Sequence, residues 1–156
     1  MDGLVSDHVS VDGIDATDVL SNMIRNCRFK DLRVVMIDGL GFAGFNLVDI
    51  KRLYDETGLP VIVVVRKKPN FSEIKKALRN LGDFDYRWSC VEKAGEPVSV
   101  ETKPGKRIYI QYTGLSRRDA CHITRLTSTR SMIPEPVRIA HIIGQGVVLG
   151  ESRGKA

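Results

Sequence analysis

The sequence has 156 residues, of which 42% are hydrophobic and 28% charged, a composition typical of a globular protein and not of a disordered chain. This length predicts one domain, residues 1–156, with a continuous hydrophobic core. No apolar run approaches the ~20 residues needed to cross a bilayer, and the N-terminus lacks the pattern of a signal peptide, so we expect a cytoplasmic protein with no membrane partner.

The charged residues are unevenly distributed along the chain. The net charge of +5 permits a polyanionic partner without demanding one. Acidic residues are dense before residue 20, whereas the segments 66–68 and 116–130 are strongly basic. The cysteines are widely spaced and include no C-x-x-C pair: Cys27, Cys90 and Cys121. We therefore expect buried reduced thiols and no disulfide framework or zinc site.

The first part of the chain predicts two strands and two helices. Residues 8–13, HVSVDG, alternate apolar and polar side chains, as a half-buried strand does. Residues 15–27 carry apolar side chains at helical spacing behind potential capping residues. Residues 33–37, RVVMI, form a short apolar run that is typical of a strand covered on both faces. Asn46 can cap a further helix that runs to about Thr57.

The middle of the chain predicts a buried strand, a helix and a hairpin. Residues 60–65, PVIVVV, are strongly apolar and β-branched, which places them in the sheet interior. A helix is expected to open at Ser72 and to end at Gly82. Residues 97–101 and 107–113 flank a Pro-Gly pair and therefore predict a β-hairpin.

Two helices are predicted after the hairpin. Ser116 and Asp119 have the spacing of a capping box. Pro136 suits the first turn of a helix to about Leu149, which is apolar nearly all round and is therefore predicted to be buried. The order of strands and helices indicates an α/β domain with a partly parallel sheet.

The segment 34–44, VVMIDGLGFAG, allows two interpretations. Its glycines have G-x-G-x-x-G spacing: Gly39, Gly41 and Gly44. This spacing after a strand is found in dinucleotide-binding loops, and the cations at 66–68 would suit the 2′-phosphate of NADP. However, Asp38 would bring a carboxylate beside the pyrophosphate, where hydrogen-bond donors are needed. The chain after residue 83 also abandons the alternation of strand and helix.

The second interpretation takes Asp38 as a functional carboxylate at the end of a central strand. With a second acid nearby it could hold Mg²⁺, although an Asp that merely opens a turn remains the ordinary structural alternative. In the last helix the polar residues Arg138, His141 and Gln145 form one stripe, which needs polar partners if the helix is buried. A hydrogen-bonded core histidine also fits this stripe. Together the two features suggest a metal-dependent site.

Four segments follow one another along the chain: VVMIDGLG, GLPVIVVVRKK, RIYIQYTGLSRRDA and IPEPVRIAH. In this order they resemble the motifs of endonuclease V, a ribonuclease H-like nuclease. The match is closer to an uncharacterised, mainly archaeal family related to endonuclease V, through VDGIDATD, DGLGFAGFN and PEPVRIAH. The nuclease likeness spans roughly 33–142, and the likeness to the archaeal family covers almost the whole chain. The resemblance implies a ribonuclease H-like α/β fold, a mixed sheet with flanking helices.

The resemblance also implies site residues. Asp38 matches the metal-binding Asp of the V-D-G strand, and His141 matches the residue that acts at the metal or at the leaving group. Lys67 or Lys68 lies where the nuclease has a strand-end lysine. A carboxylate ahead of the first helix should be a second ligand, and we choose Asp15. The candidates for this ligand are Asp12, Asp15 and Asp18. The implied chemistry is hydrolysis of a phosphodiester in DNA or RNA with Mg²⁺ or Mn²⁺.

The same comparison predicts how the chain meets its partners. The basic residues expected to contact nucleic acid are Arg66, Lys68, Arg117, Arg118 and Arg138. The strand that carries the first Asp of ribonuclease H-like sites has no counterpart in this sequence, so N-terminal strands of the sheet are expected to be missing. The free edge would then invite a homodimer. Two alternatives to a nuclease are a non-catalytic nucleic-acid-binding module and an NADP-type dinucleotide binder.

Overall fold

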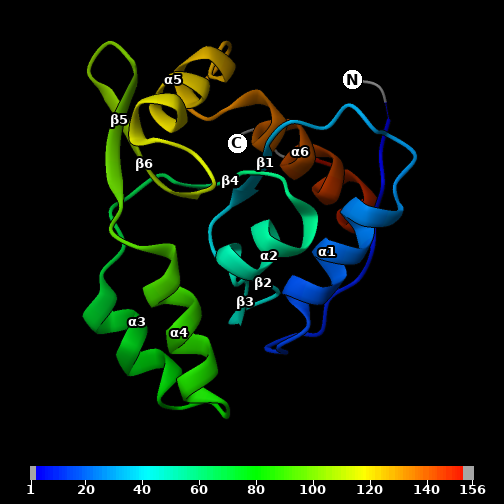
Figure 1. Ribbon diagram of the computed structural model, residues 1–156, viewed down its shortest axis with the longest axis vertical. Helices are drawn as coiled ribbons and strands as arrows, with labels where there is room; N and C mark the ends of the chain where they lie inside the picture. Colours follow the sequence, from blue (N-terminus) through cyan, green and yellow to red (C-terminus); the bar gives the residue numbers. More distant parts are fainter. Residues whose placement is uncertain (1–2, 153–156) are drawn as a thin grey trace.

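A four-stranded sheet lies at the centre of the computed structural model, which describes residues 3–152 (Figure 1). Its strands are Val35–Asp38 (β1), Val61–Val65 (β4), Val98–Lys103 (β5) and Lys106–Thr113 (β6). The strand order is β1-β4-β6-β5, with β1 parallel to β4 and the other pairs antiparallel. The expected mixed α/β sheet is therefore confirmed. A small separate hairpin consists of Gly41–Phe42 (β2) and Asn46–Leu47 (β3).

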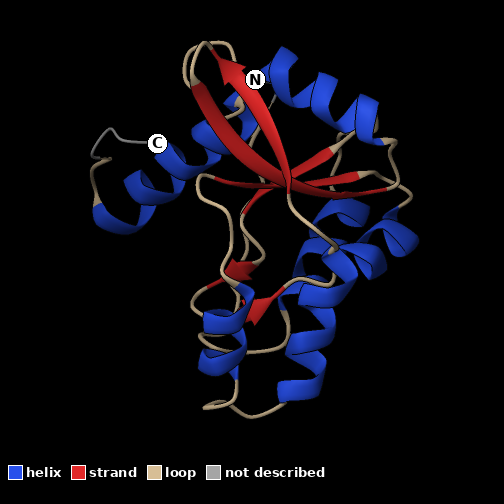
Figure 2. Ribbon diagram, turned by 90° about the vertical axis from the view of Figure 1, so that its left-hand side faces the viewer, coloured by secondary structure: helices blue, strands red, loops and turns tan. Residues whose placement is uncertain are grey.

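Helices lie on both sides of the sheet (Figure 2). They are Ala16–Asn26 (α1), Ile50–Thr57 (α2), Phe71–Leu78 (α3), Phe84–Ala94 (α4), Arg117–Thr127 (α5) and Glu135–Leu149 (α6). One apolar cluster joins the sheet to α1 and α2, and a second joins it to α5 and α6. Among these helices of the described chain, none is long and apolar enough to cross a membrane.

Strand β4 forms the interior of the sheet, as its composition predicted. Val61 and Val63 belong to the cluster on the α1 and α2 side, whereas Ile62 and Val64 belong to the cluster on the opposite side. All four residues have no exposed surface. A strand with partners on both edges and helices on both faces has no polar face, which explains its nearly continuous run of β-branched residues.

The hairpin and the capping box are also confirmed. Strands β5 and β6 pair across the Pro-Gly turn, where Gly105 has a left-handed φ of 69°. The hydroxyl of Ser116 accepts a hydrogen bond from the backbone N–H of Asp119 at 3.1 Å and so caps α5. The cysteines are free, with Cys27 and Cys90 buried, as predicted, and Cys121 half-buried.

Two predictions for the first part of the chain are wrong. Residues 8–13 form no strand, because their polar groups bind the β2–β3 hairpin instead of a neighbouring strand. Asn46 does not begin a helix but lies in β3, where its buried side chain accepts a hydrogen bond from the N–H of Ala16 at 3.0 Å. It thus caps α1 from a distance, and Asp49 caps α2 through the N–H of Arg52.

Two further differences concern helices. Helix α4 was not expected from the sequence, because its polar and aromatic residues show only weak helical periodicity. It packs against α3 around Leu78, Cys90 and Val91 in a third apolar cluster. Helix α6 was predicted to be buried, but only its first turn is, at Val137. Its last turn is exposed to solvent, with relative exposures of 68 to 79% at Val147, Val148 and Leu149.

Candidate metal and nucleic-acid site

Asp38 and His141 meet at the carboxyl end of β1. Along this strand Ile37 points into the cluster on the α1 and α2 side, so alternation directs its neighbours Met36 and Asp38 toward α6. Nδ1 of His141 on α6 lies 3.8 Å from Oδ2 of Asp38, and the two side chains are 34% and 38% exposed. This distance is too long for a hydrogen bond. Both groups are therefore adjacent and accessible.

The pair offers an incomplete but usable donor set for a metal ion. Within residues 3–152 no three or more His, Cys, Asp or Glu side chains gather closely enough to hold one. Mg²⁺ commonly keeps several waters and takes one or two carboxylates together with substrate phosphates. The exposed carboxylate of Asp38 fits this mode of binding, with the remaining positions left to water and phosphate.

An apolar cavity of about 370 Å³ adjoins this pair. Its walls come from α1, β1 and α6, and its polar side chains are Asp38 and His141. Strand β1 pairs only with β4 in the described part of the chain, so its other edge faces this cavity. The expected homodimer through this free edge stays a prediction.

Asp15 is held in a different environment. Its carboxylate accepts hydrogen bonds from the hydroxyl of Ser10 at 2.8 Å and from the carboxamide of Asn46. These donors, the amide of Asn46 above all, lower the pKa of the Asp15 carboxyl below its usual value. The other two candidate acids are also engaged: Asp12 with the N–H of Phe45, and Asp18 with Arg52. A metal-binding role of Asp15 stays a prediction.

Arg87 organises this neighbourhood, and sequence analysis missed it. Arg87 lies on α4 and is only 4% exposed. Its guanidinium donates hydrogen bonds to backbone carbonyl groups outside this helix. The acceptors are the carbonyl oxygens of Asp12, Gly13, Phe45 and Gly82. Arg87 therefore fastens both the segment before α1 and the β2–β3 hairpin to α4. Backbone acceptors leave no mark in a sequence, so nothing in the pattern of residues indicated this role.

The predicted nucleic-acid-binding residues fall into separate groups. Strands β1 and β4 are parallel, and Asp38 pairs with Val64. The exposed residues 66–68, which follow β4, therefore lie at the same end of the sheet as Asp38. These residues are Arg66, Lys67 and Lys68. Asp38 and Lys67 are thus brought to the same end of the sheet.

The other basic residues lie elsewhere. Strand β6 is antiparallel to β4, and its last residue, Thr113, pairs with Val61 at the start of β4. Arg117 and Arg118, at the start of α5, therefore come after the opposite end of the sheet. Arg138 on α6 forms a 2.7 Å ion pair with Glu135. This pairing raises the pKa of the Arg138 guanidinium and occupies the donors that a phosphate would use. The structure therefore divides the predicted binding residues between two ends of the sheet.

The glycine segment has the wrong geometry for a dinucleotide-binding loop. Such a loop leads directly into the N-terminus of a helix, but here it leads into the β2–β3 hairpin, and α2 begins only at Ile50. Gly39 and Gly44 have left-handed φ values of 75° and 88°. A Cβ atom at Gly44 would lie 2.2 Å from a carboxylate oxygen of Asp12, so this glycine permits a close approach between two segments. The NADP-type interpretation is therefore wrong.

A family model described as endonuclease dU matches residues 1–148. The chain is 51% identical to a UPF0215 protein of Methanosarcina acetivorans, over all of this chain and 81% of that protein. It is 50% identical to a UPF0215 protein of Methanothermobacter thermautotrophicus, over all of this chain and 76% of that protein. The expected relationship to a mainly archaeal family is thus confirmed.

Two solved structures resemble the fold. A protein of unknown function from Archaeoglobus fulgidus has a TM-score of 0.82 and 39% identity, over 90% of this chain and 79% of that one. Human ENDOV has a TM-score of 0.51 and 21% identity, over 86% of this chain and 63% of that one. The second likeness supports the expected endonuclease V-like, ribonuclease H-like fold.

Proposed function

Because this chain belongs to the endonuclease dU family, we propose that it is a metal-dependent phosphodiesterase that cleaves DNA at deoxyuridine. The observation that carries the proposal is the pair of Asp38 and His141, whose side chains lie 3.8 Å apart at a sheet end that also bears Lys67. A carboxylate, an imidazole and an ammonium group are the groups that phosphodiester hydrolysis needs.

Each residue has a distinct role in this proposal. Asp38 would hold Mg²⁺ or Mn²⁺, and the chemistry that such an ion would supply there is activation of water and neutralisation of phosphate charge. An imidazole can act as a general acid, and Nδ1 of His141 lies 3.8 Å from Oδ2 of Asp38. His141 therefore protonates the oxygen that leaves phosphorus when the water oxygen forms its new bond. Lys67 binds a non-bridging phosphate oxygen, with Arg66 and Lys68 extending the positive surface along the strand.

The direct test is cleavage of a labelled single-stranded oligonucleotide that contains one deoxyuridine, with thymidine at that position as the control. We expect Mg²⁺- or Mn²⁺-dependent cleavage at deoxyuridine by the wild-type chain. Asp38→Asn should lower the rate at least 100-fold, since it removes the carboxylate ligand. The matched control is Asp31→Asn, at an exposed position away from the site. Equal cleavage by Asp38→Asn and Asp31→Asn would refute the role of Asp38.

A second candidate function is a non-catalytic nucleic-acid-binding module. It is favoured by one observation: Asp38 and His141 form a pair and not a larger group of ligands in the described chain. Isothermal titration of Mg²⁺ and Mn²⁺ into the wild type and into Asp38→Asn separates the two candidates. A nuclease should bind metal through Asp38. A module without catalysis should show no such binding and no cleavage, but DNA affinity that falls steeply with salt.

A further inference from the structure

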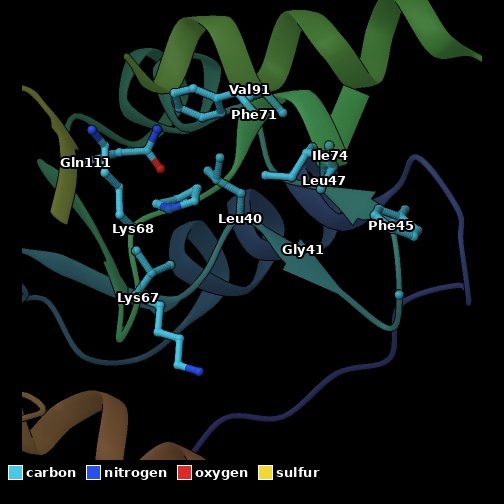
Figure 3. Close-up of a pocket in the computed structure, with 13 residues that line it drawn as sticks. Leu40, Gly41, Phe45, Leu47, Lys67, Lys68, Phe71, Ile74, Val91 and Gln111 are labelled. Atoms are coloured by element: carbon cyan, nitrogen blue, oxygen red, sulfur yellow. The ribbon is translucent and has the colours of Figure 1, made fainter. Parts of the chain in front are cut away.

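A second cavity, of about 380 Å³, lies where the chain leaves β1 and β4. Figure 3 shows its side chains, which come from the loop after β1, the loop after β4, and helices α3 and α4. The walls are mostly apolar: Leu40, Leu47, Phe71, Ile74 and Val91. Lys67 and Lys68 also line it. The volume is in the usual range for a small-molecule site, about 300–1,000 Å³.

One polar side chain reaches this apolar cavity from the sheet. Gln111 on β6 is only 2% exposed, and its Nε2 donates a hydrogen bond to the carbonyl of Gly95 at 2.6 Å. A carbonyl can only accept, so this contact fixes which way the carboxamide faces. None of the hydrogen bonds within residues 3–152 uses Oε1 of Gln111. In Figure 3 this oxygen lies on the side of the cavity.

The free acceptor of Gln111 indicates what the cavity would bind. A ligand that covers Oε1 without donating a hydrogen bond to it would leave this acceptor buried and unpaired, so a ligand that donates one binds more tightly. The ring of Phe71 offers a surface on which a flat heterocycle can stack. A planar ring with a single N–H donor at its edge fits these features, and uracil attached to a sugar through N1 is such a ring.

The cavity is also close enough to the metal site to act with it. Leu40 lines the cavity and follows Asp38 by two residues, so their Cα atoms are within ~7 Å of each other. Asp38 itself faces α6, on the other side of this strand end. A nucleotide that crosses the strand end at Gly39 could therefore place its base in the cavity and its phosphate near Asp38 and Lys67.

We propose that the cavity receives one unstacked base and that Gln111, through Oε1, selects bases that present a ring N–H. This deepens the proposed function, on which it rests for the choice of a nucleic acid as ligand. Enzymes that act at single bases commonly take them out of the stack into a fitted pocket. Gln111 would act as the specificity-determining residue and would take no part in the hydrolysis.

The test measures binding without cleavage, by fluorescence anisotropy in excess EDTA. Three single-stranded oligonucleotides differ at one central position: deoxyuridine, N3-methyldeoxyuridine or an abasic sugar. The wild type should bind the first about tenfold more tightly than the second, because methylation removes the donor. Gln111→Leu should bind both equally, whereas the control Asn80→Leu, at an exposed residue, should keep the preference.

A third variant tests the location. Ile74→Trp should fill the cavity and reduce the affinity for the deoxyuridine oligonucleotide to that for the abasic one. Equal binding of both uracil oligonucleotides by the wild type, or a preference that persists in Gln111→Leu, would overturn the proposal. Should Gln111→Leu fail to fold, the wild-type comparison still decides.

The outcomes also separate this proposal from the proposed function. A preference for uracil over N3-methyluracil without metal-dependent cleavage would support the cavity and reject the nuclease. Cleavage at deoxyuridine without that preference would support the nuclease and reject the role of Gln111.

Discussion

The segment before α1 and the carboxyl end of β1 each carry an aspartate, and the two side chains have opposite hydrogen-bonding environments. Asp15 is surrounded by donors from Ser10 and Asn46, within a neighbourhood that Arg87 fastens together. Asp38 has an accessible carboxylate, and Nδ1 of His141 lies 3.8 Å from it. A carboxylate whose oxygens are already satisfied stabilises a fold, whereas one left open can bind a metal or a substrate. The contrast therefore separates an acid that is hydrogen-bonded within the fold from one that is accessible to a ligand.

Replacing Arg87, which holds the segment before α1 in place, should have the largest effect on the free energy of unfolding. Arg87→Met keeps the length of the buried side chain but leaves its carbonyl partners without their donor. We expect a loss of about 3 kcal/mol in the free energy of unfolding, since several charge-assisted hydrogen bonds disappear together. Urea denaturation measures this loss. The control Arg79→Met, at an exposed residue, should change stability by less than about 0.5 kcal/mol.

Removing the amide that links the segment to β3 should have the next largest effect. Asn46→Ala eliminates the acceptor for the N–H of Ala16 and the donor to both Asp15 and the carbonyl of Ser10. We expect the free energy of unfolding to fall by about 2 kcal/mol. Asn46 is fully buried, and its loss removes both the cap of α1 and the hydrogen bonds that join β3 to Ser10 and Asp15. The same urea measurement checks it, and a loss as small as that of Arg79→Met would contradict the assignment.

The pH dependence of stability sharpens the contrast further. The pKa of Asp15 is lower in the folded chain than its ordinary value of 3.8. A lowered folded-state pKa contributes stability above the unfolded pKa, and this contribution is lost as the pH falls through the folded value. The stability difference between wild type and Asp15→Asn should therefore shrink as the pH falls below about 5 and on through the lower folded pKa. Ser10→Ala removes one donor and should reduce this pH dependence in part. A difference that is constant with pH would contradict the role of these hydrogen bonds.

The smallest effect on stability is expected at Asp38. Its partly exposed carboxylate makes no hydrogen bond within residues 3–152, so Asp38→Asn should change the free energy of unfolding by less than about 0.5 kcal/mol. Thermal or urea denaturation checks this expectation beside the cleavage assay. A large loss of stability would mean that Asp38 supports the fold, and the distinction between the two aspartates would then fail.

Local signals made much of the fold predictable. The β-branched run of β4, the Pro-Gly turn before β6 and the capping box at Ser116 each act within a few residues, so the sequence carries their cause directly. Helix α4 was missed because its apolar residues face partners on more than one side. The buried face of α6 was overestimated, since its composition gives no sign that the last turn extends beyond the core.

The candidate site was predictable only in part. The position of Asp38 at a strand end and the polar stripe on α6 led to a pair that the structure brings together. The network around Asp15 was not predictable, because the contacts of Asn46 and Arg87 span at least 30 and up to 75 residues of sequence and are largely made to backbone atoms. The direction in which Oε1 of Gln111 faces was also not predictable, because the carboxamide is oriented by a hydrogen bond to the backbone carbonyl of Gly95.

The alternation of side chains along β1 has a consequence for how this protein tolerates changes in length. Ile37 faces the core, and Asp38 faces His141 on the other side of the strand. Inserting or deleting one residue between 33 and 37 would exchange these faces, placing a carboxylate in the core and an isoleucine beside the imidazole. Substitutions among apolar residues leave this alternation intact. Viable length variants should therefore have their gaps in the surface loops and not in this strand.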